Sequence, residues 1–142
     1  MKPGGRVLGI AESYRAETST VAGCVLRGEH AVDGLVFGTW TVGGTDATAT
    51  ILDLFDRLDR EDLQYLLVAG IAPAWFNVVD LHRIHEATGV PVLSVSFEES
   101  PGLDSAIAEA FEDGAAATRL ARYREQPPRR PVAIGDQTLY VR

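Results

Sequence analysis

The sequence predicts an α/β fold in which a five-stranded mixed sheet is flanked by helices. Three short apolar runs rich in β-branched and aromatic residues come first, at 6–11, 21–26 and 32–42. Two more runs, 63–69 and 91–97, each follow a segment with helical periodicity. Consecutive strands form an antiparallel meander, whereas strands that alternate with helices pair in parallel, so we expect three meander strands and two parallel ones.

The first helix is predicted where the meander stops. Gly43 and Gly44 break the third strand, and Thr45 or Asp46 is a suitable N-cap for the periodic apolar residues that follow. The pattern ends near Asp59, so this helix connects the meander to the fourth strand.

The second half is organised around 66–80, which predicts a strand, a loop and a helix. The apolar run 63–69 stops at Gly70, and a helical pattern begins near Asn77 and runs to Thr88, with Gly89 as its C-cap. The fifth strand, 91–97, precedes two helices at 103–112 and 115–125. The proline-rich segment 126–142 is predicted as a short C-terminal extension whose residues 132–134 and 139–141 pair as a hairpin.

This element order predicts which strands are neighbours. A central first strand with right-handed crossovers places the fourth strand beside it, which is the ribonuclease H-like arrangement, although flavodoxin-like variants fit the same pattern. Ala11, Glu12 and Ala69 would then approach one another at the strand ends. Ligands collect at the carboxyl ends of strands in open α/β sheets, so the loop 70–77 is the expected place for a site.

Length and charge limit the class of protein. The 142 residues predict a single domain. The N-terminus MKPGGR lacks the apolar core of a signal peptide and no apolar run is long enough for a membrane span, so we expect a cytoplasmic protein with no membrane contact. The net charge of −7 argues against a general nucleic-acid-coating protein. Five arginines within 119–130 reverse this locally, either as a solvated helix face and tail or as a phosphate-contacting patch.

Several blocks of the sequence resemble one family. RVLGIAES, VAGCVLR, VGGTDAT and GIAPAWFNVVDLHRIHEATGVPVLSVSF are similar to the archaeal endonuclease V-like family, also called the endonuclease dU family. The resemblance covers the chain up to about Glu112. It implies a ribonuclease H-like fold and, by relation to endonuclease V, Mg²⁺-dependent cleavage of DNA or RNA near a deaminated base such as uracil or inosine, a DNA-repair activity.

The chain departs from that family where catalysis would occur. The resemblance implies an aspartate at the end of the first strand and another at the end of the fourth, but Ala11 and Ala69 stand there. Two-metal hydrolysis needs clustered carboxylates, so their loss predicts weakened or absent metal binding. Glu12 and Asp46 remain as candidate catalytic acids and metal ligands, with Glu98 as a further ligand. Strand alternation puts Glu12 on the face opposite Ala11 unless the strand ends or bulges, and an N-cap role explains Asp46 without chemistry.

Candidate substrate-binding residues lie around the same strand ends. They are Tyr14, Trp75, Asn77, Arg122 and Arg124, with Trp75 able either to stack on a base or to form a partner interface. Two hypotheses follow. The chain is a diverged nuclease with weak metal-dependent cleavage, or it is a non-catalytic module that binds nucleic acid or a protein through loop 70–77. The edge of the third strand, with Phe37 and Trp40, is a candidate homodimer surface.

Overall fold

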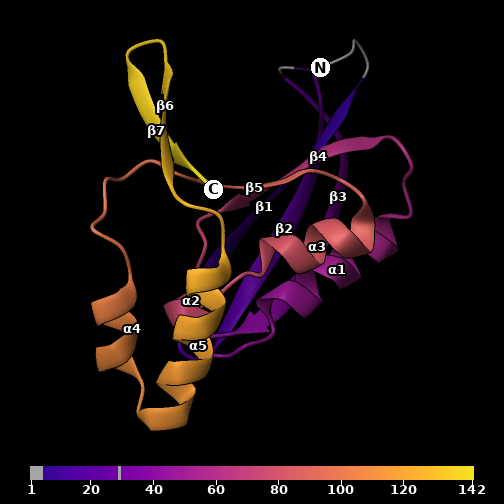
Figure 1. The fold of residues 1–142 in the computed structure, drawn as a ribbon. Helices are drawn as coiled ribbons and strands as arrows, with labels where there is room; N and C mark the ends of the chain where they lie inside the picture. Colours follow the sequence, from indigo (N-terminus) through magenta and orange to yellow (C-terminus); the bar gives the residue numbers. More distant parts are fainter. Residues whose placement is uncertain (1–4, 29) are drawn as a thin grey trace.

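The computed structural model describes residues 5–28 and 30–142 and contains one mixed sheet with helices (Figure 1). The strands are β1 (Arg6–Arg15), β2 (Thr18–Arg27), β3 (Ala31–Thr41), β4 (Leu63–Ala69), β5 (Val92–Ser96), β6 (Arg130–Ile134) and β7 (Gln137–Val141). The helices are α1 (Ala47–Leu58), α2 (Pro73–Phe76), α3 (Leu81–Thr88), α4 (Asp104–Ala110) and α5 (Asp113–Glu125). The strand order is β3-β2-β1-β4-β5-β7-β6.

The first two meander strands are longer than the apolar runs that predicted them, whereas β3 has the predicted length. β1 pairs with β2 from Arg6↔Arg27 to Arg15↔Thr18, so the segment between the predicted runs 6–11 and 21–26 shrinks to a turn at residues 16 and 17. Main-chain hydrogen bonds hold such a ladder whatever the side chains are, and therefore polar residues continue the strands beyond the core. The alternation is regular, with Leu8 and Ile10 buried and Ala11 exposed.

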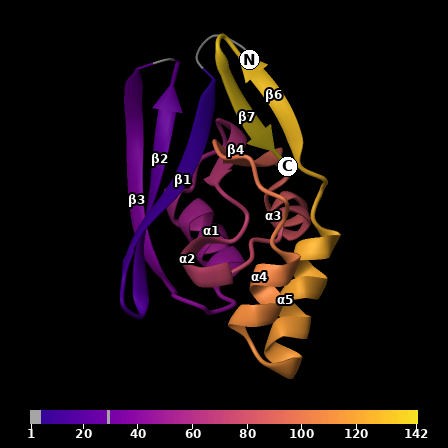
Figure 2. The ribbon, with the colours of Figure 1, turned by 90° about the vertical axis from the view of Figure 1, so that its left-hand side faces the viewer.

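The predicted neighbours at the centre of the sheet are confirmed. β1 and β4 are parallel and adjacent, with Ile10 opposite Val68, and β4 pairs in parallel with β5. The range of β4 agrees with the predicted 63–69. The two crossovers contain α1 and α3, whose buried residues, such as Ile51 and Ile84, pack in the same core as Leu8 and Leu66. The sheet and the helices therefore form two layers, which Figure 2 shows from the side of the meander.

The prediction of five strands is wrong, because the C-terminal hairpin joins the sheet. β7 pairs with β5 through Val95↔Val141 and Ser96↔Tyr140, and β6 pairs with β7. Without this hairpin β5 would leave an open row of main-chain hydrogen-bonding groups at the edge of the sheet. Residues 126–142, expected as an extension of the domain, thus supply two of seven strands.

The helix after β4 begins later than predicted. α3 starts at Leu81 instead of Asn77, and Asp80 caps it by accepting a hydrogen bond from the Arg83 N–H at 3.2 Å. The short α2 turn precedes it, with three successive residues, Ala74 to Phe76, at positive φ. Gly89 ends α3 at φ 73°, in the left-handed conformation predicted for its C-cap.

Candidate functional site

The ends of β1 and β4 lie side by side and carry two methyl groups. Ile10 is opposite Val68, and the next residue on each strand is Ala11 and Ala69, both exposed. Because adjacent parallel strands present paired positions to the same face, the two alanines lie on the face opposite Ile10 and Val68. This is where the family resemblance implies two carboxylates.

Glu12 points away from those alanines. β1 runs without a bulge against β2 as far as Arg15, so alternation turns Glu12 to the helix-covered face. There its Oε1 accepts hydrogen bonds from Ser19 Oγ at 2.7 Å and Trp40 Nε1 at 3.3 Å, both from side chains that are at most 2% exposed. The structure therefore places Glu12 as a partner of buried donors on a different face from Ala11 and Ala69.

Asp46 and Asn77 form a part-buried polar connection between three segments. Asp46 accepts from the Thr41 N–H at 3.0 Å, from Thr41 Oγ1 at 2.9 Å and from Asn77 Nδ2 at 2.7 Å. Burial raises the pKa of this carboxyl, but the donors of Thr41 and Asn77 outweigh burial and hold the pKa below its ordinary value. Asp46 is thus ionised and its oxygens are engaged.

Asn77 supplies the side chain that caps α1. Asp46 occupies the N-cap position, as predicted, but its side chain makes no capping hydrogen bond. Asn77 Oδ1 accepts from the Ala47 N–H at 3.0 Å, and its Nδ2 also donates to the Thr41 carbonyl at 2.9 Å. Its side chain is fully buried, so Asn77, a predicted substrate contact, lies behind the surface and fixes the loop from within.

Trp75 is presented on a strained turn beside this connection. It is 55% exposed and has φ 58°, a conformation that bulky residues rarely adopt. Its ring packs against Phe76 with centroids 5.1 Å apart. The turn is held to the β3–α1 loop by the Gly43 N–H, which donates to the Ala74 carbonyl at 2.7 Å. The main chain thus fixes Trp75 at the surface, where an aromatic ring can stack on a ligand.

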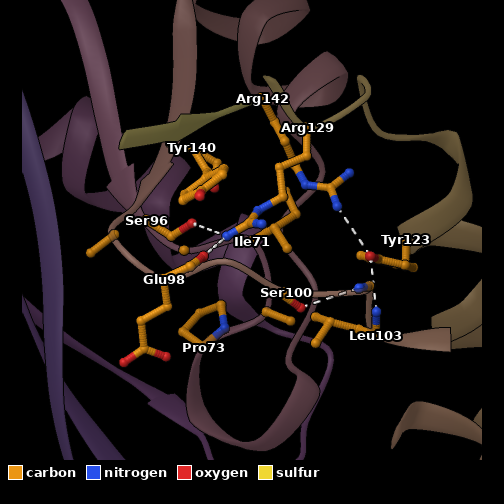
Figure 3. Close-up of a pocket in the computed structure, with 15 residues that line it drawn as sticks. Ile71, Pro73, Ser96, Glu98, Ser100, Leu103, Tyr123, Arg129, Tyr140 and Arg142 are labelled. Carbon is orange, nitrogen blue, oxygen red and sulfur yellow. Dashed lines mark hydrogen bonds between the residues drawn. The ribbon is translucent and has the colours of Figure 1, made fainter. Parts of the chain in front are cut away.

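A pocket of about 300 Å³ opens next to the carboxyl ends of β4 and β5. The loop 69–73 forms one wall, and the rest is formed by β5, the segment 98–103 that follows it, Tyr123 of α5, and residues at and beside the C-terminal hairpin (Figure 3). Ser94 and Ser96 are two residues apart on β5 and therefore share one face of the strand. Tyr140 and Arg142 are likewise two residues apart on the β7 side, and both pairs face the pocket. Hydroxyl groups, two tyrosine rings and two arginines thus line the pocket together with the apolar residues of the loop 69–73.

The two arginines of the pocket have only neutral partners. Arg129 donates to Ser96 Oγ at 3.1 Å and to the Glu98 carbonyl, and its guanidinium lies over the Tyr140 ring. Arg142 donates to the Tyr123 hydroxyl at 3.0 Å and to the Pro127 carbonyl at 3.0 Å. Among the described residues no carboxylate forms an ion pair with either side chain. Two positive charges are therefore available to an anion.

The remaining predicted site residues are spread around this region. Tyr14 is 53% exposed near the end of β1, and Glu98 lines the pocket. Arg124 on α5 forms an exposed ion pair with Asp104 at 2.8 Å, and Arg122 lies on the same helix. In the part of the chain that the structure describes, no three or more His, Cys, Asp or Glu residues form a group that could hold a metal ion.

Arg142 was not a predicted site residue, and Arg129 was considered only as part of the arginine cluster. Their placement depends on the hairpin joining β5, which the sequence pattern did not indicate. A signal was nevertheless available, because Tyr140 and Arg142 are two residues apart in a strand and so share one face.

Comparisons with solved structures show which known fold the chain resembles. The chain superimposes on human ENDOV with a TM-score of 0.57 at 16% identity, covering 96% of this chain and 68% of that one. It also superimposes on a Ciona intestinalis endonuclease V bound to inosine-containing DNA, with a TM-score of 0.56 at 10% identity and coverage of 96% and 70%. These likenesses show an endonuclease V-like fold. A crystal structure of a protein of unknown function from Archaeoglobus fulgidus gives a TM-score of 0.78 at 27% identity, covering 96% of this chain and 76% of that one.

The chain belongs to the endonuclease dU family, whose sequence model matches residues 3–142. A UPF0215 protein of Methanopyrus kandleri is 40% identical over 99 residues, which are 67% of this chain and 50% of that protein. A UPF0215 protein of Thermococcus kodakarensis is 33% identical over 137 residues, covering 90% of this chain and 69% of that protein. The chain thus spans between half and about two thirds of the length of these relatives.

Proposed function

We propose that this protein binds nucleic acid as a non-hydrolysing member of its family, recognising deaminated DNA or RNA in the cytoplasm. The observation that carries the proposal is the pocket at the ends of β4 and β5, where Arg129 and Arg142 have no carboxylate partner. Arginine presents a planar fork of donors that matches phosphate oxygens, and two such groups in one pocket suit a backbone phosphate.

The residues present do not fit the Mg²⁺ ions that the family resemblance implies. At the strand ends the donor set is two methyl groups, from Ala11 and Ala69. Glu12 is on the other face and accepts from buried donors, and the oxygens of Asp46 accept from Thr41 and Asn77. Mg²⁺ demands near-octahedral oxygen ligands, which these side chains do not offer together. The proposed function therefore contains no metal-dependent step.

Recognition of a base is assigned to the exposed ring of Trp75. An exposed, rigidly held indole offers a stacking surface, and base stacking on aromatic side chains tolerates many sequences. Selectivity for uracil or inosine is supported by membership in the endonuclease dU family and by the inosine-containing DNA bound to the Ciona intestinalis neighbour.

Fluorescence anisotropy with labelled oligonucleotides tests this function. Single strands containing deoxyuridine, deoxyinosine or neither are titrated in EDTA and again in MgCl₂, and the products are then separated on a denaturing gel. We expect binding that is indifferent to EDTA, tighter for a deaminated base, and without strand cleavage. Cleavage that needs Mg²⁺, or no saturable binding to any oligonucleotide, would overturn the proposal.

The salt dependence of oligonucleotide binding tests whether Arg129 and Arg142 contact backbone phosphates. Arg129→Gln and Arg142→Gln should each reduce the slope of log K against log salt by about 0.7, the value for one single-strand phosphate contact. Arg27→Gln is the matched control, because it removes the same charge far from the pocket. Arg27 lies at the end of β2, opposite Arg6 in the strand register and therefore beside the start of β1. Equal slopes in all three variants would exclude the pocket as the phosphate site.

The arginines of α5 give a separate test of the wider surface. Charge reversal of Arg122 and Arg124 should weaken oligonucleotide binding and flatten its salt dependence if α5 extends the binding surface. Unchanged binding would leave these residues as a solvated helix face, in keeping with the exposed ion pair of Arg124 with Asp104.

A further inference from the structure

In the part of the chain that the structure describes, one face of the three-stranded meander has no helix over it (Figure 2). α1, α2 and α3 lie on the same side of the meander, and the other side of β1, β2 and β3 is bare in Figure 2. The exposed fractions agree, because Val36 and Trp40 on β3 are at most 8% exposed while Leu35 and Phe37, on either side of Val36, are 58% and 57% exposed. We call this side, formed by the residues of the five strands β1 to β5 that alternate with the core, the open face.

The open face is apolar over several strands. Its central rows are Ala11–Ala22–Phe37 and Gly9–Cys24–Leu35, as the registers of β1, β2 and β3 place them. The face continues onto β4 and β5, where Leu67 is paired with Leu93 and Ala69 with Val95. None of these positions carries an acidic or basic side chain, although the whole chain has 20 acidic and 13 basic residues. Exposed apolar patches of this extent mark interaction surfaces.

The open face has a shape that can fit against the same face of a second copy. Gly9, Ala11, Ala22 and Cys24 make a shallow strip of small side chains along β1 and β2. Beside it, Leu35 and Phe37 stand as a ridge on β3. A second copy related by a two-fold axis would place its ridge on the first copy's strip and receive the first copy's ridge on its own. Such isologous contacts are the commonest in homo-oligomers.

The area also matches what a stable dimer needs. β1, β2 and β3 have 10, 10 and 11 residues, and β4 and β5 have 7 and 5. With a rise of about 3.3 Å per residue and strands about 4.8 Å apart, the open face covers roughly 650 Å² per copy. Stable interfaces bury about 800 Å² per partner, and side-chain relief adds to the flat estimate.

We propose that the open face is the contact surface of a symmetric homodimer, in which two sheets pack face to face. A second copy is the occupant because it brings the same ridged surface, whose central rows carry no charged side chain, whereas the whole chain has an acidic excess, with a net charge of −7. The contact uses the face of the sheet and not the edge predicted from Phe37 and Trp40, since Trp40 is 2% exposed and lies in the core. This inference does not depend on nucleic-acid binding.

The dimer gives a physical reason for alanine at position 11, one of the two positions where the family resemblance implies an aspartate. Ala11 lies in the strip of small residues at the centre of the contact. A carboxylate there would be desolvated by the second copy without a partner, which is costly. Ala11→Asp should therefore dissociate the dimer.

Light scattering coupled to size exclusion tests the proposal on the chain as it exists. At 100 µM we expect twice the chain mass of 15.3 kDa. We expect a dimer that is not weakened by 0.5 M NaCl, because apolar contact between two acidic copies gains from screening. Phe37→Glu should give a monomer with unchanged circular dichroism. Trp75→Glu, which changes an aromatic residue of nearly the same exposure outside the sheet, should leave the dimer intact.

The reactivity of Cys24 provides a measurement that needs no substitution in the interface. It is the only cysteine of the chain and is half-buried on the open face of the single copy. Its rate of reaction with a thiol reagent should rise at least tenfold on dilution from dimer to monomer. A monomer at 100 µM, a dimer that survives Phe37→Glu, or a Cys24 rate independent of concentration would each overturn the proposal. A monomer would also leave the open face to another segment or protein.

Discussion

Asn77→Ala is expected to be the most damaging single change near the candidate site. The buried side chain makes three hydrogen bonds, to the Ala47 N–H, the Thr41 carbonyl and Asp46 Oδ1. A neutral hydrogen bond contributes about 1 kcal/mol net and one to a charged group about 2 kcal/mol, so the free energy of unfolding should fall by about 4 kcal/mol. This is a large part of the 5–15 kcal/mol that stabilises a typical domain.

Urea unfolding followed by circular dichroism measures this loss. Gln137→Ala, an exposed amide on β7, is the control and should change the unfolding free energy by less than about 0.5 kcal/mol. If Asn77→Ala costs less than about 1 kcal/mol, the idea that Asn77 holds the end of β3, the start of α1 and the α2 turn together is refuted.

The pH dependence of Asn77→Asp gives the same reasoning a second test. At pH 7 the new carboxylate would face Asp46 Oδ1 and the Thr41 carbonyl where two N–H donors now lie, so this variant should be less stable than Asn77→Ala. In the wild type the pKa of Asp46 is lowered by folding from its ordinary value of 3.8. The contribution of Asp46 to the unfolding free energy is therefore complete above pH 3.8 and is lost as the pH falls through the lower pKa of the folded state. In Asn77→Asp the pH dependence has the opposite sign, because the carboxylate of residue 77 faces Asp46 and is destabilising while it is charged. As the pH falls toward 4 and this carboxylate is protonated, the difference in unfolding free energy between Asn77→Asp and Asn77→Ala should become smaller.

Three further predictions concern the strand ends, an ion pair and the exposed indole. The double variant Ala11→Asp and Ala69→Asp should gain saturable Mg²⁺ binding with a dissociation constant on the order of 1 mM in calorimetry, and an absence of heat would contradict the side-by-side strand ends. Hydrogen bonds from Arg6 and then Arg60 lower the pKa of Asp33 to about 2, so the stabilisation is complete above pH 3.8 and lost as the pH falls through 2. In Arg60→Gln, an NMR titration should show that pKa moving toward 3.8; an unmoved value would discount Arg60. Trp75→Ala should weaken oligonucleotide binding about tenfold, as loss of one stacked base does, and equal affinity would remove Trp75 from the proposed surface.

The central part of the fold was predictable because its pattern is local. The apolar run of β4 is bounded by a polar segment and Gly70, and so its range agrees with the prediction. The neighbourhood of β1 and β4 followed from the right-handed crossover rule. That neighbourhood, together with alternation, also placed Ala11 and Ala69 on one face and Glu12 on the other.

The number of strands was not predictable in this way. The hairpin of β6 and β7 was anticipated as a local pair, but its docking on β5 depends on main-chain hydrogen bonds such as the two between Ser94 and Arg142, which any residue can make. For the same reason the sequence did not indicate that Arg129 and Arg142 would reach one pocket.

The sequence by itself determined the α/β class, the order of the central strands and the replacement of two expected carboxylates by alanine, because these depend on local periodicity and residue identity. Only the tertiary structure decided that Asn77 caps α1 across 30 residues, that two arginines share a pocket without acidic partners, and that one face of the sheet is uncovered. These features arise from contacts between segments distant in the chain, and a local pattern carries no information about which distant groups meet.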